Sequence, residues 1–199
     1  MSSLAQMLLE QLTNQQSVDR LSRQVGADAG ATQNAVGAAL PVLLGALAKN
    51  STQSSGAEAL ERALSKHDGG VLDNLGGFLD SPDVDDGNGI LGHLLGGRRN
   101  AVETGVSKAS GVDLSMVTKL LPILAPIVMG ALGRQKRQQN LDAGGLSSML
   151  GSERKQMEQS SPAAGILGQL LDEDGDGSIA DDIAGKLGKG LLGGLFGRR

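Results

Sequence analysis

Apolar residues recur at three- and four-residue spacings along much of this chain, which is the pattern of helices that bury one face. Two short amphipathic segments, at about residues 3–12 and 17–25, come first. Long alternating runs of β-branched or aromatic residues, which are typical of strands, are missing. The pattern therefore predicts an all-α fold with a core of Leu, Ala, Val, Ile and Met.

The two most apolar segments resemble each other. Residues 26–50 align without a gap on residues 111–135, and a second block, GILGHLL from Gly89, recurs as GILGQLL from Gly165. The identical pairs in the first block are Gly26/Gly111, Asp28/Asp113, Pro41/Pro126, Gly45/Gly130, Ala46/Ala131 and Leu47/Leu132. We predict an internally duplicated helical domain over residues 1–164, with repeat units at about residues 17–97 and 102–171.

Each repeat unit carries a proline, Pro41 or Pro126, inside its apolar helix. An internal proline removes one helical hydrogen bond and bends the axis, so both helices are expected to be kinked. Short helices are expected at residues 57–64 and 141–150, and the GILG block is expected to start a further helix. The most flexible stretches are expected at residues 49–56, 80–89 and 152–164.

A longer run, DGNGILGHLLGGRRNAVETGVSKASGVDLSMVTKLLPILAPIVMGALGRQ, resembles the bacterial domain-of-unknown-function family 937 (YidB-like). The resemblance covers most of the chain. It implies an all-helical fold and a bacterial source. It implies no established activity and supplies no catalytic residues.

Acidic residues are concentrated in LDEDGDGSIADDI, residues 171–183. Asp172, Asp174 and Asp176 occupy the first, third and fifth positions of a D-x-D-x-D-G pattern, which Gly177 completes. In an EF-hand loop these carboxylates converge on one ion, the glycine allows the sharp bend, and the next residue, here Ser178, offers its backbone carbonyl. The spacing predicts a Ca²⁺ site in an EF-hand-like loop within residues 165–199.

The pattern departs from an EF-hand at its last ligand, where Ile183 replaces the usual Glu. Asp181, Asp182 or water would have to supply that ligand. The predicted calcium ligands are Asp172, Asp174, Asp176, Ser178, Asp181 and Asp182. The alternative is a solvated Asp-Gly turn before the last helix, whose first turn would favour Asp181 and Asp182 without metal.

The Gly/Leu-rich tail repeats Leu187, Leu191 and Leu195 at four-residue spacing, with Phe196 beside them. All charged residues beyond Ala184 are basic. Such an amphipathic cationic helix suits an anionic membrane surface or a partner protein. The alternative is that its apolar face closes over the core of its own chain.

Composition narrows the function classes. The chain has a net charge of −4 and no Cys, Trp or Tyr. The negative charge disfavours nucleic acid as a partner, and the absence of Cys excludes disulfides and thiolate metal sites. The N-terminus lacks the basic segment of a secretory signal, and the apolar run at residues 120–132 is shorter than a membrane span. A cytoplasmic protein with a buried helix there is expected.

Residues suited to catalysis are sparse. His67 and His93 are the only histidines, and no nucleophile elbow, HExxH motif or phosphate-binding loop occurs. Residues 106–121 resemble a helix-turn-helix, but their second helix is apolar and is interpreted as core. The basic clusters Arg98/Arg99 and Arg134/Lys136/Arg137, and the acidic stretch 80–89, are interpreted as solvated loops.

The expected function is therefore that of a non-enzymatic, calcium-binding structural or interaction protein, in which the metal orders the C-terminal segment. Its partner would be an unidentified protein or a second copy of the chain. The alternative is a self-assembling or membrane-surface scaffold without a functional metal site.

Overall fold

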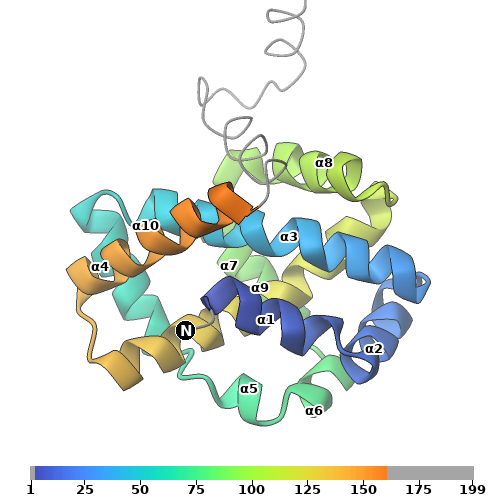
Figure 1. Cartoon of the computed structure of the whole chain (residues 1–199), viewed down its shortest axis with the longest axis horizontal. Helices are drawn as coiled ribbons and strands as arrows, with labels where there is room; N and C mark the ends of the chain where they lie inside the picture. Colours follow the sequence, from blue (N-terminus) through green and yellow to red (C-terminus); the bar gives the residue numbers. More distant parts are fainter. Residues whose placement is uncertain (1–2, 161–199) are drawn as a thin grey trace, which may run out of the picture.

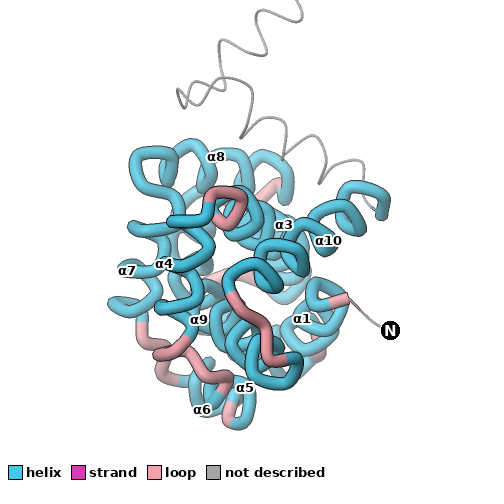
Figure 2. Tube along the Cα trace, turned by 90° about the vertical axis from the view of Figure 1, so that its left-hand side faces the viewer, coloured by secondary structure: helices cyan, strands magenta, loops and turns pink. Residues whose placement is uncertain are grey.

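The computed structural model describes residues 3–160, and these contain helices and no strands (Figures 1 and 2). The prediction of an all-α fold is confirmed for this part of the chain. The elements are α1 (Leu4–Thr13), α2 (Gln15–Val25), α3 (Ala29–Asn50), α4 (Ser54–Leu64), α5 (Gly70–Asp73), α6 (Leu75–Asp80), α7 (Val84–Leu95), the 3-10 helix η1 (Gly96–Arg98), α8 (Arg99–Ser110), α9 (Leu114–Gln139) and α10 (Ala143–Ser160).

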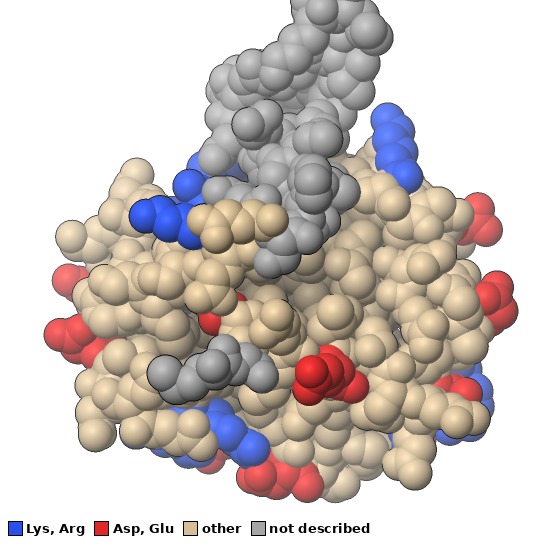
Figure 3. All heavy atoms as spheres, viewed as in Figure 1, with Lys and Arg blue, Asp and Glu red and all other residues tan. Residues whose placement is uncertain are grey.

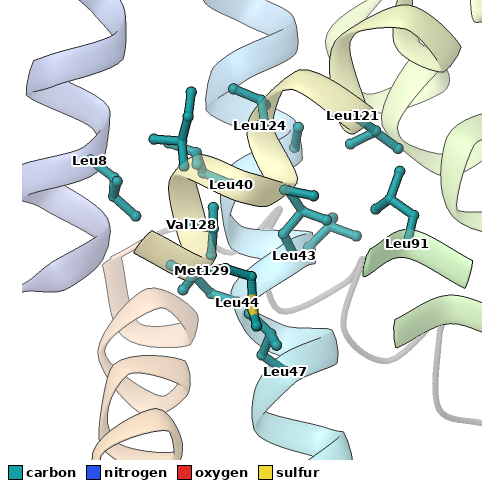
Figure 4. Close-up of a cluster of buried hydrophobic side chains, with 14 of the residues drawn as sticks. Leu8, Leu40, Leu43, Leu44, Leu47, Leu91, Leu121, Leu124, Val128 and Met129 are labelled. Carbon is teal, nitrogen blue, oxygen red and sulfur yellow. The ribbon is translucent and has the colours of Figure 1, made fainter. Parts of the chain in front are cut away.

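Two long helices, α3 and α9, form the centre of the fold and pack against each other. Helices α1, α2, α7, α8 and α10 pack on α3, and α1, α2, α4, α5, α7 and α8 pack on α9. Figure 4 shows Leu40, Leu43 and Leu44 of α3 lying among Val128 and Met129 of α9. These apolar side chains can be buried together without leaving a polar group that lacks a hydrogen-bonding partner.

The same local structure introduces both central helices. Gly26 ends α2 and Gly111 ends α8, with left-handed φ angles of 75° and 70° that favour glycine. Two residues later, Asp28 precedes α3 and accepts a hydrogen bond from the Ala31 N–H at 2.8 Å, and Asp113 precedes α9. The predicted Gly-x-Asp turns therefore connect a short helix to each long one.

Prolines lie inside both central helices, as predicted. Pro41 is internal to α3, and Pro122 and Pro126 are internal to α9. Every residue from 120 to 132 is buried, which confirms that this run belongs to a core helix. The helix is longer than this apolar run, because further residues on both sides extend α9 to 26 residues. By length and composition α3 and α9 could each cross a membrane, but 89% of the most apolar stretch of α9 is buried in the fold.

Several predicted loops are helical instead. Helix α7 begins at Val84, so most of the stretch 80–89 is not a loop, and the GILG block lies within this helix and does not start it. Asp83 accepts a hydrogen bond from the Asp86 N–H at 2.9 Å and so caps the helix. Only three residues separate α3 from α4, and α10 continues to Ser160. Residues 161–164 lie outside the described part.

Candidate functional site

The predicted site residues all lie outside residues 3–160, so the structure does not describe them. This holds for the calcium ligands Asp172, Asp174, Asp176, Ser178, Asp181 and Asp182, and for the surface-contact residues Leu187, Leu191, Leu195 and Phe196. Their roles stay predictions, as does the EF-hand-like loop itself.

Within residues 3–160, no group of three or more His, Asp or Glu side chains is placed to hold a metal ion. His67 Nδ1 lies 3.9 Å from the Asp86 Oδ2 atom, and His93 is exposed on α7. Among the described residues there is therefore no metal centre formed by residues distant in the sequence.

The aspartates of the stretch 80–89 lie at helix ends and in ion pairs between helices. Asp80 accepts a hydrogen bond from Arg20, and its other carboxylate oxygen lies 3.8 Å from the guanidinium of Arg23. Asp85 and Asp86 lie in the first turn of α7, where the helix dipole favours carboxylates. The interpretation as a solvated loop was wrong because these residues cap and anchor two helices.

The basic cluster Arg134/Lys136/Arg137 is also structural. Arg134 donates a hydrogen bond to the Gly69 carbonyl at 2.7 Å and pairs with Asp73, which ties α9 to α5. Lys136 Nζ lies 3.2 Å from a carboxylate oxygen of Glu61 in α4. Both basic residues belong to α9, so their interpretation as loop charges was wrong.

Two buried carboxylates have roles that sequence reasoning missed. Glu103 is 5% exposed and pairs with Arg99 at 2.7 Å. Glu153 of α10 is 9% exposed and accepts hydrogen bonds from the backbone N–H groups of Leu4 at 2.9 Å and Ala5 at 3.2 Å. Glu153 therefore caps the start of α1, although the two lie about 150 residues apart in the sequence. The four-residue spacing of Arg99 and Glu103 could have suggested the first contact, but no local signal points to the second.

The helices of residues 3–160 leave one side of α3 incompletely covered. Gly37, Ala38, Pro41 and Gly45 lie on one face of the helix and are all partly exposed, and we call them the α3 face. Only 56% of the most apolar stretch of α3 is buried, compared with 89% for α9. Helix α3 crosses the front of the molecule between α1 and α8 (Figure 1), where uncharged residues dominate the surface (Figure 3).

The described residues thus define an all-α protein built around two central apolar helices, with an uncharged face left open on one of them. Residues 6–135 match the family model described as DUF937, bacterial protein of unknown function, and the chain belongs to this family. No curated protein and no solved structure matches the chain.

Proposed function

We propose that this protein is a non-enzymatic calcium-binding structural or interaction protein. In this proposal, the helices of residues 3–160 form a scaffold that carries a metal loop at residues 172–183. The observation that carries the proposal is the spacing of Asp172, Asp174 and Asp176 directly before Gly177, which matches the first half of an EF-hand loop. The described helices fit the structural part of this role, because Arg134, Lys136 and Glu153 make contacts that join α9 to α5, α9 to α4 and α10 to α1.

The proposed mechanism is linkage between metal binding and folding. Without a cation, the carboxylates of the loop repel one another, and this opposes any compact arrangement of the loop. Binding of Ca²⁺ would remove that repulsion, and its binding free energy would stabilise the ordered loop. The exit direction of the Gly/Leu-rich tail would then depend on calcium.

We further propose that the scaffold is an internal duplication that relates α2, α3 and α4 to α8, α9 and α10. The helix contacts support this, because they are preserved when the two sets are exchanged. Helix α3 packs on α8 as α9 packs on α2, and α10 packs on α3 as α4 packs on α9. The equivalent pairs α3/α9 and α4/α10 pack on each other, as a pseudo-twofold axis between them would require.

Titration calorimetry tests the calcium site. We expect Ca²⁺ to bind the full chain, and the double variant Asp172→Ala/Asp176→Ala to lose the binding heat. A matched control, Glu10→Ala/Asp19→Ala, removes two exposed carboxylates of the scaffold and should bind as the parent chain does. Absence of binding heat and of any change in melting temperature at millimolar Ca²⁺ would refute the proposal.

A second function is favoured by the open α3 face together with the leucine spacing of the tail. The chain would then be a scaffold that assembles with itself or lies on an anionic membrane. Co-sedimentation with anionic liposomes, with and without residues 184–199, tests the membrane contact. Light scattering over a range of protein concentrations tests self-assembly. No sedimentation and a constant monomer mass would exclude this second function.

A further inference from the structure

The α3 face has an equivalent on α9 that is fully covered. Under the proposed duplication, Gly37, Pro41 and Gly45 correspond to Pro122, Pro126 and Gly130. All three α9 residues are buried, whereas all three α3 residues are partly exposed. Two of the three pairs, Pro41/Pro126 and Gly45/Gly130, are identical, so their difference in exposure comes from what packs against each helix.

Helix α7 covers the first part of the α9 face. Gly87 lies so close to the backbone of Pro122 that a Cβ atom at position 87 would overlap the Pro122 carbonyl group. Leu91 of α7 points toward Leu121 of α9 (Figure 4). Pro122 corresponds to Gly37 of α3, and within residues 3–160 no atom outside the local backbone lies within 4 Å of a Cβ built on Gly37. The counterpart of α7 is thus missing from the described residues.

The sequence contains that counterpart at residues 165–171. Its GILGQLL repeats the GILGHLL of α7, in which Leu91, Leu94 and Leu95 are buried while Gly92 and His93 are exposed. The repeat places Leu at each buried position and Gly or Gln at each exposed position. The residue equivalent to Gly87 is Ala163, which is also small. The second block therefore has leucines at the positions that are buried in α7.

We propose that residues 165–171 form a helix that docks on the α3 face, in the position that α7 occupies on α9. This inference rests on the proposed duplication and is independent of whether the chain binds calcium. At the contact between α7 and α9, the glycine that allows the close approach is Gly87 of α7. At the proposed contact, the glycine would be Gly37, which belongs to the central helix α3 and not to the docking segment. Docking would bury the apolar α3 face, which carries no charge to repel an apolar partner.

The end of the described chain supports docking within one molecule. Helix α10, which ends at Ser160, packs on α3. The five residues from Ser160 to Gly165 can span roughly 17 Å when extended, which is longer than the distance between neighbouring helices. The docked helix would hold the chain directly before Asp172, so calcium would act on the tail and leave the scaffold unchanged.

Distances between spin labels test the docking. The chain has no native Cys, so labels attach only to introduced ones. One labelled pair is Asn34→Cys with Gln169→Cys, which reports on the proposed contact. Its equivalent under the duplication is Lys119→Cys with His93→Cys, which reports on the α7 contact with α9. Asn34, Lys119 and His93 are exposed, so labels there should not disturb the core.

We expect a narrow distance distribution for Asn34/Gln169 with the same centre as that for Lys119/His93. Adding Gly37→Arg should broaden the first distribution and leave the second unchanged, because the open site accepts a side chain but the docked helix does not. Gly89→Arg, at another open helical glycine, is the matched control and should change neither distribution.

A broad or longer Asn34/Gln169 distribution beside a narrow Lys119/His93 distribution would overturn the proposal. An Asn34/Gln169 distribution that does not change on adding Gly37→Arg would also overturn it. So would a distribution that is lost on dilution with unlabelled chain, because the segment would then dock on a second copy. Measurements with Ca²⁺ and with a chelator separate this proposal from the calcium site. Matching distances without any calcium binding would sustain the docking and refute only the metal proposal.

Discussion

Gly87 of α7 lies directly against the carbonyl group of Pro122 in α9, and a Cβ atom at position 87 would overlap that group. The contact lets two helix backbones approach each other closely, and it joins the helix that carries the GILG block to the centre of the fold. Pro122 and Pro126 make this part of α9 unusual, because proline has no backbone N–H and the carbonyls four residues earlier therefore lack their normal helical donor.

Replacing Gly87 by Ala should therefore destabilise the protein although Ala is the better helix former. We expect a loss of about 1–3 kcal/mol in the free energy of unfolding, since the backbone of Pro122 cannot move aside cheaply. Gly89→Ala, in the same helix and facing open space, should instead stabilise the fold by about 0.5–1 kcal/mol. Urea denaturation measures both. Equal effects of the two substitutions would contradict the close contact.

Glu153→Ala should weaken the attachment of α1 to the scaffold. The substitution removes the acceptor of two backbone N–H groups at the start of α1, and a hydrogen bond to a charged group contributes about 1.5–3 kcal/mol. We expect a loss of this order in the free energy of unfolding, together with faster amide hydrogen exchange in α1. Lys155→Ala, on an exposed position of α10, is the control and should change neither. Unchanged exchange in α1 would argue against the cap.

Arg134→Ala should loosen α5 from α9 more than removal of its acidic partner does. The guanidinium donates to the Gly69 carbonyl at 2.7 Å as well as pairing with Asp73, whose side chain is 73% exposed. An exposed ion pair contributes little, so Asp73→Asn should cost less than about 1 kcal/mol. Arg134→Ala should cost more, because it also leaves a carbonyl without its donor. Thermal unfolding of both variants measures the two losses. A larger loss of stability for Asp73→Asn than for Arg134→Ala would contradict the role of the Gly69 hydrogen bond.

Asp68 should make a small acid-dependent contribution to stability. The Gly70 N–H donates to its carboxylate and the Arg137 guanidinium lies beside it, and these lower the pKa of Asp68 from its ordinary value of 3.8. A lowered folded-state pKa stabilises the fold above the unfolded value, and this contribution is lost as the pH falls through the folded pKa. Asp68→Asn should thus be less stable than the parent near neutral pH, and the difference should vanish in acid. Arg137→Gln should reduce the pH-dependent part of that difference, and a difference independent of pH would exclude the carboxylate as its source.

Much of the helical framework could be predicted from local patterns. The Gly26-x-Asp28 and Gly111-x-Asp113 turns are short-range signals, and they predicted where both central helices begin. The prediction of a loop in the acidic stretch before Gly89 was wrong, because carboxylates are equally suited to a solvated loop and to the first turn of a helix. Only the distant partners of these residues, such as Arg20 for Asp80, distinguish the two.

The open α3 face could not be predicted from the sequence, because α3 and α9 have closely similar apolar patterns. Gly45 and Gly130 occupy equivalent positions in the two helices. Val71 packs over Gly130, whereas no described residue packs over Gly45. What covers a helix depends on the neighbours that the chain brings to it, and these are set by tertiary packing. The predicted calcium ligands follow from spacing alone, and they lie beyond the described residues.

Amide hydrogen exchange of the full chain, with Ca²⁺ and with a chelator, tests the central claim most directly. If calcium orders the C-terminal segment, Ca²⁺ should slow exchange in peptides from residues 172–196 and leave the helices of residues 3–160 unchanged. The Asp172→Ala/Asp176→Ala variant should show no such slowing. Identical exchange of the parent chain at millimolar Ca²⁺ and in chelator would contradict the claim.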